Sequence, residues 1–183
     1  MNLSKSFFSS WNQFFMSMAF FVAMKSKDRS TRVGAIIVDR RRRIVSAGYN
    51  GFPRGVDDDK TERHRRPLKY LWMYHAERNA LDNADVTPGC VLYTPWIPCA
   101  PCAGSIIQKE VKEVVHYYPF NNGFGSQMFE IVGCHDWMTS IIESRKMLRE
   151  AGVKLRLYDG DELVTEILQV CGEKVEKPRR RSK

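Results

Sequence analysis

The sequence predicts an α/β fold of three layers, in which a five-stranded mixed sheet is flanked by helices. Short apolar runs of strand character predict five strands, and segments with helical apolar spacing stand before or between them. Only a charged turn separates the first two runs, which predicts an antiparallel hairpin, whereas a helical segment joins the last two, which predicts a parallel pair. The predicted strands are Val33–Val38, Ile44–Tyr49, Val91–Tyr93, Val111–Tyr118 and Val153–Tyr158.

The first predicted helix covers Ser10–Lys25, where apolar residues recur at helical spacing. Its apolar part, Phe14–Met24, is as long as the core of a signal peptide, but it lacks a small-x-small cleavage site and runs directly into polar residues and a predicted strand. We therefore interpret it as an amphipathic helix whose aromatic residues pack in the core. No apolar run approaches the roughly 20 residues that span a bilayer.

Further helices are predicted along the chain. Leu68–Asn83 has helical character, and the sequence leaves open whether one helix covers it or a break falls just before His75. Proline is favourable at a helix start, so Pro98–Gln108 is predicted as a helix that begins at its proline. Trp137–Ala151 predicts a helix that ends at Gly152. The remaining segments are an irregular connection, Pro119–Asp136, and a last short helix, Asp161–Cys171.

Composition suits one globular domain with a core, since 43% of the residues are hydrophobic and neither a repeat nor a second domain is evident. We expect this domain over residues 1–171 and a disordered basic tail over residues 172–183. Five lysines and arginines in the last seven residues carry +5 of the formal net charge of +8, which leaves only +3 elsewhere. This is weak evidence for nucleic-acid binding, because a polynucleotide binder usually spreads basic residues over a folded face.

The chain has five cysteines, of which two belong to a Cys-x-x-Cys motif. The other three, Cys90, Cys134 and Cys171, show no spacing typical of a disulfide framework. This usage predicts a protein of the reducing cytoplasm.

Two short motifs carry the chemistry: His75-Ala76-Glu77, and further on Pro98-Cys99-Ala100-Pro101-Cys102. One imidazole and two thiols form the ligand set of a zinc site that keeps a fourth position for water, and zinc lowers the pKa of such a water to near neutrality. Glu77 lies two residues past the histidine, close enough to exchange a proton with that water without binding the metal. We therefore predict one zinc held by His75, Cys99 and Cys102, with Glu77 as the catalytic acid and base.

The cysteine pair has two other interpretations. A Cys-x-x-Cys motif can be a redox pair, or half of a structural zinc site with four protein ligands. The chain offers no second Cys-x-x-Cys and no His-x-x-x-His to complete a structural site. A redox pair would leave the His-Ala-Glu motif without a role, so a catalytic zinc is the favoured interpretation.

A loop dense in turn residues, Gly48–Gly55, follows a predicted strand, which is where α/β sheets place ligands. Its glycines let backbone approach a ligand closely, and Asn50 offers both a donor and an acceptor; the alternative is merely a sharp loop. The four consecutive arginines Arg40–Arg43 are interpreted as a solvated hairpin tip, with phosphate binding as the alternative. The charged segment Val56–Pro67 is expected to be a flexible loop.

These motifs resemble those of the cytidine/deoxycytidylate deaminase superfamily, and more narrowly its deoxycytidylate (dCMP) deaminases. The zinc motif is the H-x-E…P-C-x-x-C signature of zinc deaminases. The Gly-Tyr-Asn-Gly-x-Pro element is the specific part, and the resemblance extends from about Trp11 to Tyr158. It implies a cytidine-deaminase-like fold and hydrolysis of dCMP to dUMP and ammonia, which supplies dUMP for thymidylate synthesis. The matching segments are Ser30–Val38, Gly48–Gly55, His75–Ala80 and Pro98–Cys102.

The resemblance also implies roles for residues around the zinc. Asn50 would hold the deoxyribose hydroxyl, the Ala76 amide would meet the pyrimidine O2, and carbonyls near Thr94 would line the path of the exocyclic amine. Arg32 is our candidate for the 5′-phosphate because a guanidinium suits that group, and an exposed loop arginine is the alternative.

Members of this family are commonly homohexamers that dCTP activates and dTTP inhibits, with the effector site near the glycine-rich loop. By that resemblance we expect a homo-oligomer, and candidate contacts to a nucleotide effector or its Mg²⁺ at Arg54, Asp57 and Asp58. Some members carry a second, structural zinc, but no cysteine precedes Cys90 here, so we predict one zinc per subunit. Lys109–Val111 stands where the family often has a small-residue-Gly-Ile turn, a departure that bears on assembly and regulation rather than on the zinc chemistry.

Two rival functions stay open. The first is a deaminase of another cytosine or adenine nucleoside or of a nucleic acid, against which the modest charge outside the tail and the glycine-rich loop both count. The second is a zinc-binding protein without enzymatic activity, since fold alone does not imply function. The presence of Glu77, which a structural zinc does not need, counts against the second.

Overall fold

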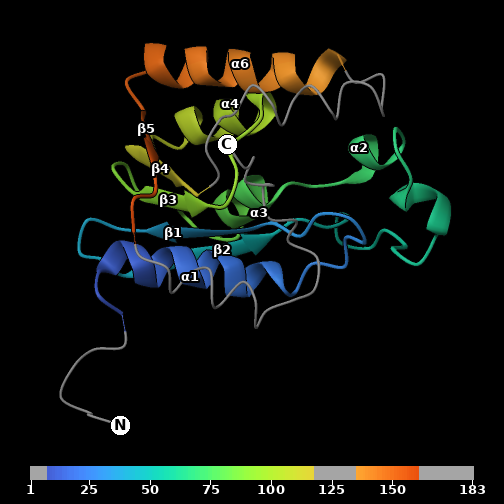
Figure 1. Ribbon diagram of the computed structural model, residues 1–183, viewed down its shortest axis with the longest axis horizontal. Coiled ribbons are helices and arrows are strands. Elements are labelled where there is room, and N and C mark those ends of the chain that lie inside the picture. The colour runs from blue at the N-terminus through green and yellow to red at the C-terminus, as the bar shows by residue number, and fades with distance from the viewer. Residues whose placement is uncertain (1–7, 118–134, 161–183) are drawn as a thin grey trace, which may run out of the picture.

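The computed structural model describes residues 8–117 and 135–160 (Figure 1). The predicted connection Pro119–Asp136 lies outside these ranges apart from its last two residues. The predicted helix Asp161–Cys171 and the basic tail of residues 172–183 lie wholly outside them.

The described strands form one five-stranded sheet, as the sequence predicted, and their order in it is β2-β1-β3-β4-β5. Within it, β1 (Gly34–Val38) is antiparallel both to β2 (Ile44–Tyr49), its hairpin partner, and to β3 (Val91–Thr94). From β3 the sheet continues in parallel through β4 (Glu113–His116) to β5 (Lys154–Leu157). The sheet is therefore mixed, and the carboxyl ends of β3, β4 and β5 share one edge.

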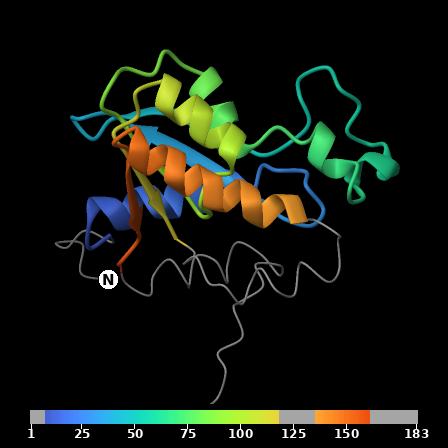
Figure 2. The same ribbon diagram turned by 90° about the horizontal axis from the view of Figure 1, so that it is seen from above.

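Helices cover both faces of this sheet (Figures 1 and 2). One face carries α1 (Trp11–Ala23), which buries Phe15 against the sheet. The other face carries α3 (Ala76–Asp82) and α4 (Ala100–Gln108), and α6 (His135–Glu150) packs against α4 and β5. No helix in the described part of the chain has the length and apolarity needed to cross a membrane.

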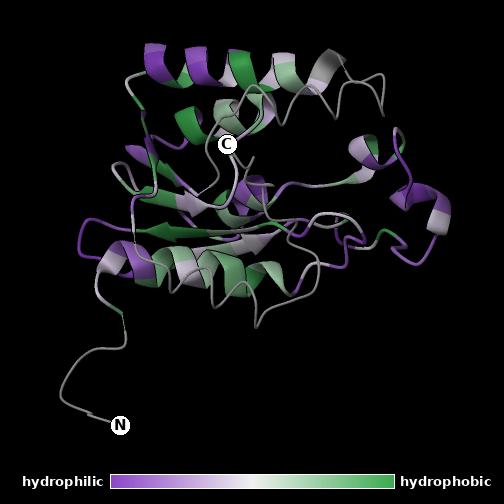
Figure 3. Cartoon of the chain, viewed as in Figure 1, coloured by the Kyte–Doolittle hydropathy of each residue, from purple (hydrophilic) through white to green (hydrophobic). Residues whose placement is uncertain are grey.

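The local sequence explains these elements. Ser10 caps α1 by accepting a hydrogen bond from the amide of Gln13 at 3.1 Å. All five residues of β1 are buried because it has a strand on either side and helices cover both of its faces. Hydrophobic residues accordingly gather along the central strands and α1, whereas the excursion that carries the short helix η1 (Thr61–His64) is largely hydrophilic (Figure 3).

Two glycines set how closely the helices approach the sheet. A Cβ on Gly34 would lie 2.1 Å from the carbonyl oxygen of Ala19 in α1. A Cβ on Gly48 would lie 2.2 Å from the amide nitrogen of Ala80 in α3. Both contacts are with backbone, so only glycine allows this spacing, and Gly48 thereby fixes the position of α3 on the sheet.

The structure answers the open question about Leu68–Asn83. The segment is broken: residues 73–75 separate α2 (Lys69–Trp72) from α3. In the gap Tyr74 pairs with Gly51, whose amide donates to the Tyr74 carbonyl at 3.0 Å and whose carbonyl accepts from the Tyr74 amide at 2.7 Å. This extended pairing cannot continue a helix, so the break falls just before His75.

The prediction that a helix begins at Pro98 is wrong by two residues. In the structure α4 begins at Ala100, and Pro101 is the proline in its first turn, where the fixed φ of proline suits a helix. Cys99 precedes the helix as its N-cap residue in an extended conformation, with φ −74° and ψ 170°.

Candidate active site

The three predicted metal ligands come together at the starts of two helices. His75 is the extended N-cap residue of α3, and Cys99 is the extended N-cap residue of α4, with Cys102 in the first turn of the same helix. The Nδ1 atom of His75 lies 3.3 Å from the Sγ of Cys99 and 3.5 Å from the Sγ of Cys102. All three ligand atoms lie within 4.8 Å of one another.

This arrangement fits zinc. Tetrahedral ligands with Zn–N near 2.0 Å and Zn–S near 2.3 Å are separated by about 3.5 Å from nitrogen to sulfur. The two nitrogen–sulfur separations in the cluster, 3.3 and 3.5 Å, match that edge length. Both cysteines are buried and the histidine is half-buried, and one imidazole with two sulfur ligands is a donor set that zinc prefers.

The ligands perturb one another's protonation. The hydrogen bond from the Cys102 thiol is the main cause that lowers the pKa of Cys99 to about 4, with His75 adding to the effect and burial opposing it. The pKa of Cys102 is raised, because it donates that hydrogen bond and lies buried. Burial by itself would lower the pKa of His75, but the hydrogen bond to Cys99 and the charge of Glu77 outweigh it, so this pKa is raised. Zinc binding would displace the protons that these groups share, because its ligands are two thiolates and a neutral imidazole.

Glu77 lies beside this cluster, in the first turn of α3, and only 4% of its surface is exposed. The Cys102 thiol lies 3.7 Å from Glu77 Oε2. Burial raises the pKa of Glu77, and the charge of His75 opposes the rise. A buried carboxyl with a raised pKa next to three ligand atoms is the arrangement expected of an acid–base residue.

Side chains from α6 and α2 pack around this cluster, and the sequence analysis did not select them. The Trp137 ring meets the His75 ring edge-on at 6.0 Å between centroids and stacks against Tyr70 at 6.3 Å. Ile141 packs with Cys99 and Cys102 in one buried cluster. Helical periodicity alone could mark Trp137 and Ile141 as an inward face, but not the helix they would meet.

Ala76 and Thr94, predicted to contact substrate, both lie at element ends: Ala76 directly follows the ligand His75, and Thr94 precedes Cys99 by five residues. Ala76 is buried as the first residue of α3, so its N–H is one of the helix amides without an intrahelical partner. Thr94 is the last residue of β3 and fully buried, and its hydroxyl has no hydrogen-bond partner among the described residues. Arg32 is exposed in the loop before β1.

Asn50, predicted to hold a sugar hydroxyl, is buried within a polar network of its own chain. Its Nδ2 donates to the Thr31 carbonyl at 2.8 Å and to Asp28 Oδ2 at 3.0 Å, while its Oδ1 accepts from the Val33 amide at 2.7 Å. Both amide hydrogens are thus engaged, and a ligand hydroxyl could only donate to the second lone pair of Oδ1.

A buried ion pair lies at the centre of that network, and the sequence analysis missed it. The ammonium group of Lys69 lies 2.6 and 2.8 Å from the two carboxylate oxygens of Asp28 and 2.6 Å from Ser30 Oγ. The Lys69 and Asp28 side chains are only 6% and 1% exposed. The pair ties α2, which follows the glycine-rich loop in sequence, to the loop before β1.

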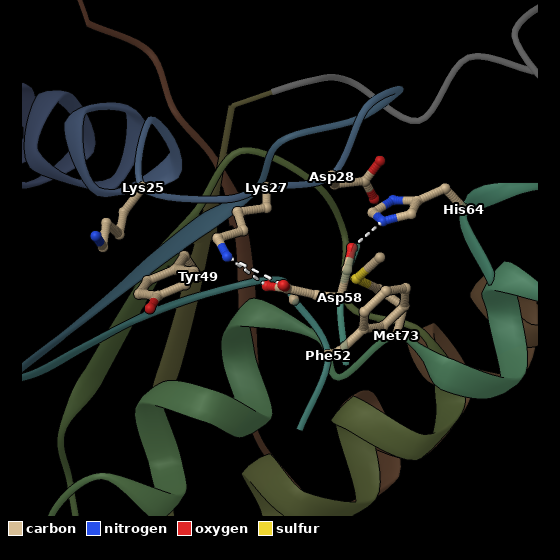
Figure 4. A pocket seen from close by; sticks show the side chains of 9 residues that line it. Lys25, Lys27, Asp28, Tyr49, Phe52, Asp58, His64 and Met73 are labelled. Carbon is tan, nitrogen blue, oxygen red and sulfur yellow. Dashed lines mark hydrogen bonds and ion pairs between the residues drawn. The ribbon is translucent and has the colours of Figure 1, made fainter. Parts of the chain in front are cut away.

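A pocket of about 250 Å³ opens beside the glycine-rich loop (Figure 4). Of the three predicted effector contacts only Asp58 lines it, paired with Lys27 at 2.8 Å. Arg54 instead donates to Asn83 Oδ1 at 3.0 Å, and Asp57 accepts from the Asp59 amide at 3.0 Å. The full lining is Lys25, Lys27, Asp28, Tyr49, Gly51, Phe52, Asp58, His64 and Met73.

Comparison with known proteins identifies the family. Residues 9–118 match the model of the cytidine and deoxycytidylate deaminase zinc-binding region. The chain belongs to that family. A mouse deoxycytidylate deaminase is 44% identical over 113 residues, which is 57% of this chain and 63% of the relative. An uncharacterized deaminase from the luxG 3′ region of Aliivibrio fischeri is 38% identical over 148 residues, covering 80% of this chain and 92% of the relative.

The fold is also similar to that of a solved structure. The apo dCMP deaminase of the cyanophage S-TIM5 superposes with a TM-score of 0.58 at 22% identity, covering 80% of this chain and 96% of the phage protein. The resemblance drawn from the sequence and the cytidine-deaminase-like α/β fold are therefore both confirmed. The chain spans less than two thirds of the length of the mammalian deoxycytidylate deaminases that it matches.

Proposed function

We propose that this protein catalyses the zinc-dependent hydrolytic deamination of dCMP to dUMP and ammonia, which supplies dUMP for thymidylate synthesis. The observation that carries the proposal is the buried carboxyl of Glu77 beside a His75–Cys99–Cys102 cluster with zinc-like spacing. The identity to relatives named deoxycytidylate deaminase supports the choice of substrate.

Zinc bound by the three ligands would supply a water that ionises near neutral pH. Every other step falls to the chain's own residues. Glu77 would take one proton from the attacking water and deliver it to N3 of the pyrimidine, then take the second from the hydroxyl gained at C4 and deliver it to the departing amine, while its burial keeps bulk water from competing. Ala76 would direct its helix-terminal N–H at the pyrimidine O2, and the carbonyls near Thr94 would accept from the exocyclic amine.

For the rest of the nucleotide we propose Asn50 and Arg32. Because the amide hydrogens of Asn50 are engaged within the chain, it would accept a hydrogen bond from the deoxyribose hydroxyl through Oδ1. Arg32 is exposed in the loop before β1, whose backbone bonds to Asn50 on either side of it, so its guanidinium could reach the 5′-phosphate without breaking a buried contact.

The test is a comparison of substrates by ammonia release. The zinc-loaded protein is given dCMP, deoxycytidine, CMP or a short cytosine oligonucleotide at equal concentration. The proposal expects selective turnover of dCMP. Turnover of the oligonucleotide or a free nucleoside in preference to dCMP would replace the substrate but keep the zinc chemistry, and the absence of turnover on all four would favour a zinc-binding protein without enzymatic activity.

We propose further that the pocket beside the glycine-rich loop binds a nucleotide effector, dCTP or dTTP, with or without Mg²⁺. Lys25 and Lys27 could neutralise phosphate, and His64 Nδ1 is a buried atom with no partner among the described residues. Asp58, which holds Lys27, would turn to the magnesium ion or release the lysine. A Lys27→Ala variant should lose the response of activity to dCTP, as measured by dCMP turnover with and without dCTP.

A homo-oligomer, with a hexamer as the expected state, and a cytoplasmic location complete the proposal. Several large apolar side chains are exposed on the single chain, among them Phe21 at 61% and Leu71 at 84%, which is the surface that subunit contacts would cover. Sedimentation equilibrium of the purified protein measures the oligomeric state directly, and a monomer at micromolar concentration would contradict the expectation.

A further inference from the structure

One hydrogen bond joins the start of the cysteine helix to a different helix. The amide of Ala100, the first residue of α4, donates to the hydroxyl of Ser140 in α6 at 3.0 Å. Ala100 directly follows Cys99, and α6 begins at His135, beyond residues 9–118 that the family model matches.

The first turn of α4 lacks an N-cap hydrogen bond from its own N-cap side chain. Helix-terminal amides have no intrahelical partner, and an N-cap side chain normally satisfies one of them. Here the N-cap residue is Cys99, whose side chain makes no cap hydrogen bond and lies instead 3.3 Å from His75 Nδ1. Pro101 has no N–H to offer. The Ser140 hydroxyl therefore acts as a substitute cap, supplied from another element.

Ser140 lies on the face of α6 that packs against the rest of the protein, and this packing fixes its position. Trp137, Ser140, Ile141, Ser144 and Leu148 are spaced as one face of a helix, and Ser144 and Leu148 are completely buried. Trp137 touches the His75 ring, and Ile141 packs against both cysteines. The same face thus contacts all three predicted ligands, with Ser140 supplying the directional contact.

We propose that Ser140 is a positioning residue for the metal centre, which fixes the start of α4 and thereby the distance of Cys99 from His75. Partners that orient metal ligands typically contribute about 10- to 100-fold to metal affinity. Loss of the hydroxyl would leave the Ala100 amide without its partner and let the Cys99 backbone move away from its position. The inference rests on the zinc site of the proposed function and adds α6 to it.

The test is the zinc affinity of the purified protein, measured by competition with a chromophoric chelator after metal removal. Ser140→Ala is expected to weaken zinc binding at least tenfold, and Ser140→Thr, which keeps a hydroxyl, to restore most of it. The matched control is Ser105→Ala, which removes a hydroxyl bonded to the Pro101 carbonyl within the same helix at 3.3 Å and is expected to change affinity little. Circular dichroism of each metal-free variant reports whether the fold is intact.

Three results would overturn the inference: unchanged affinity in Ser140→Ala, an equal loss in Ser105→Ala, or no recovery in Ser140→Thr. A wild-type protein that binds no zinc at all would instead contradict the proposed function. Because wild-type binding is measured in the same titration, the two failures are distinguishable.

Discussion

The buried pair of Asp28 and Lys69 leads to a quantitative prediction about stability. Replacing Lys69 by methionine removes the ammonium group but keeps an unbranched apolar side chain with most of the volume, so little cavity is formed. The change deletes contacts of 2.6 and 2.8 Å to the two carboxylate oxygens of Asp28, whose side chain is 1% exposed. Removing one partner of a buried ion pair costs about 3–5 kcal/mol, because the other charge stays buried without compensation.

The lower end of that range applies here. The Asp28 carboxylate still accepts hydrogen bonds from the Ser30 and Thr31 amides at 2.8 and 3.0 Å and from Asn50 Nδ2 at 3.0 Å. We therefore expect Lys69→Met to lower the free energy of unfolding by about 3 kcal/mol, out of a total that is about 5–15 kcal/mol for a folded domain. For a chain of this length this corresponds to a fall in Tm of roughly 6–12 °C.

The assay is urea denaturation of Lys69→Met, Asp28→Asn and the double variant at pH 7. The double variant should lose less than the sum of the two single losses, because the charges compensate each other. Lys27→Met is the matched control, since Lys27 pairs with Asp58 at 2.8 Å but is 70% exposed, and no measurable loss is expected there. A Lys69→Met variant as stable as this control would refute the reasoning.

Three more predictions concern pH, packing and metal. Burial raises the pKa of Asp28, but the hydrogen bonds from Lys69 and Ser30 outweigh burial, so the pKa of Asp28 in the folded protein is lowered. Ionised Asp28 therefore stabilises the fold fully above the ordinary aspartate pKa of about 4, and this stabilisation is lost as pH falls through the lowered pKa of the folded state. The stability gap between wild type and Lys69→Met should therefore shrink in urea titrations below pH 4, and a gap independent of pH would contradict this. Gly48→Ala should lower the free energy of unfolding by about 1–3 kcal/mol, because the added Cβ forces α3 away from the sheet. The control is Gly104→Ala on α4, where a Cβ meets nothing within 4 Å, and it should raise the free energy of unfolding by up to about 1 kcal/mol in the same denaturation assay. Removal of zinc by a chelator should abolish dCMP turnover and lower the Tm, and adding zinc back should restore both. The Tm falls because a metal that binds only the folded state stabilises that state. A Tm unaffected by chelation would exclude a tightly bound ion.

The strands and the metal cluster could be predicted from the sequence because their signals are local. A buried interior strand such as β1 is an uninterrupted apolar run, and ligands such as Cys99 and Cys102 lie within one helical turn. His75 could be joined to them because the order and spacing of the two motifs constitute a known signature.

What could not be predicted depends on contacts between distant segments. The break before His75 exists because Tyr74 pairs with Gly51, 23 residues earlier, and no local propensity reveals that pairing. The local sequence gives no sign that Lys69 is buried, because it follows a charged segment in which a lysine is usually exposed. Only the fold brings it to Asp28. Likewise, Ser140 is one of several hydroxyl residues in α6, and its contact with Ala100 follows from how α6 packs on α4.

The central claim, that Glu77 moves protons at a zinc centre that deaminates dCMP, is tested most directly by one paired measurement. Zinc content and dUMP formation from dCMP are determined on the same samples of wild type and Glu77→Gln, a change that keeps the shape of the side chain. The account predicts one zinc per subunit in both proteins and a loss of turnover in the variant of at least about 100-fold, as expected for a general acid–base residue. Equal turnover by the two proteins at equal zinc content would contradict it.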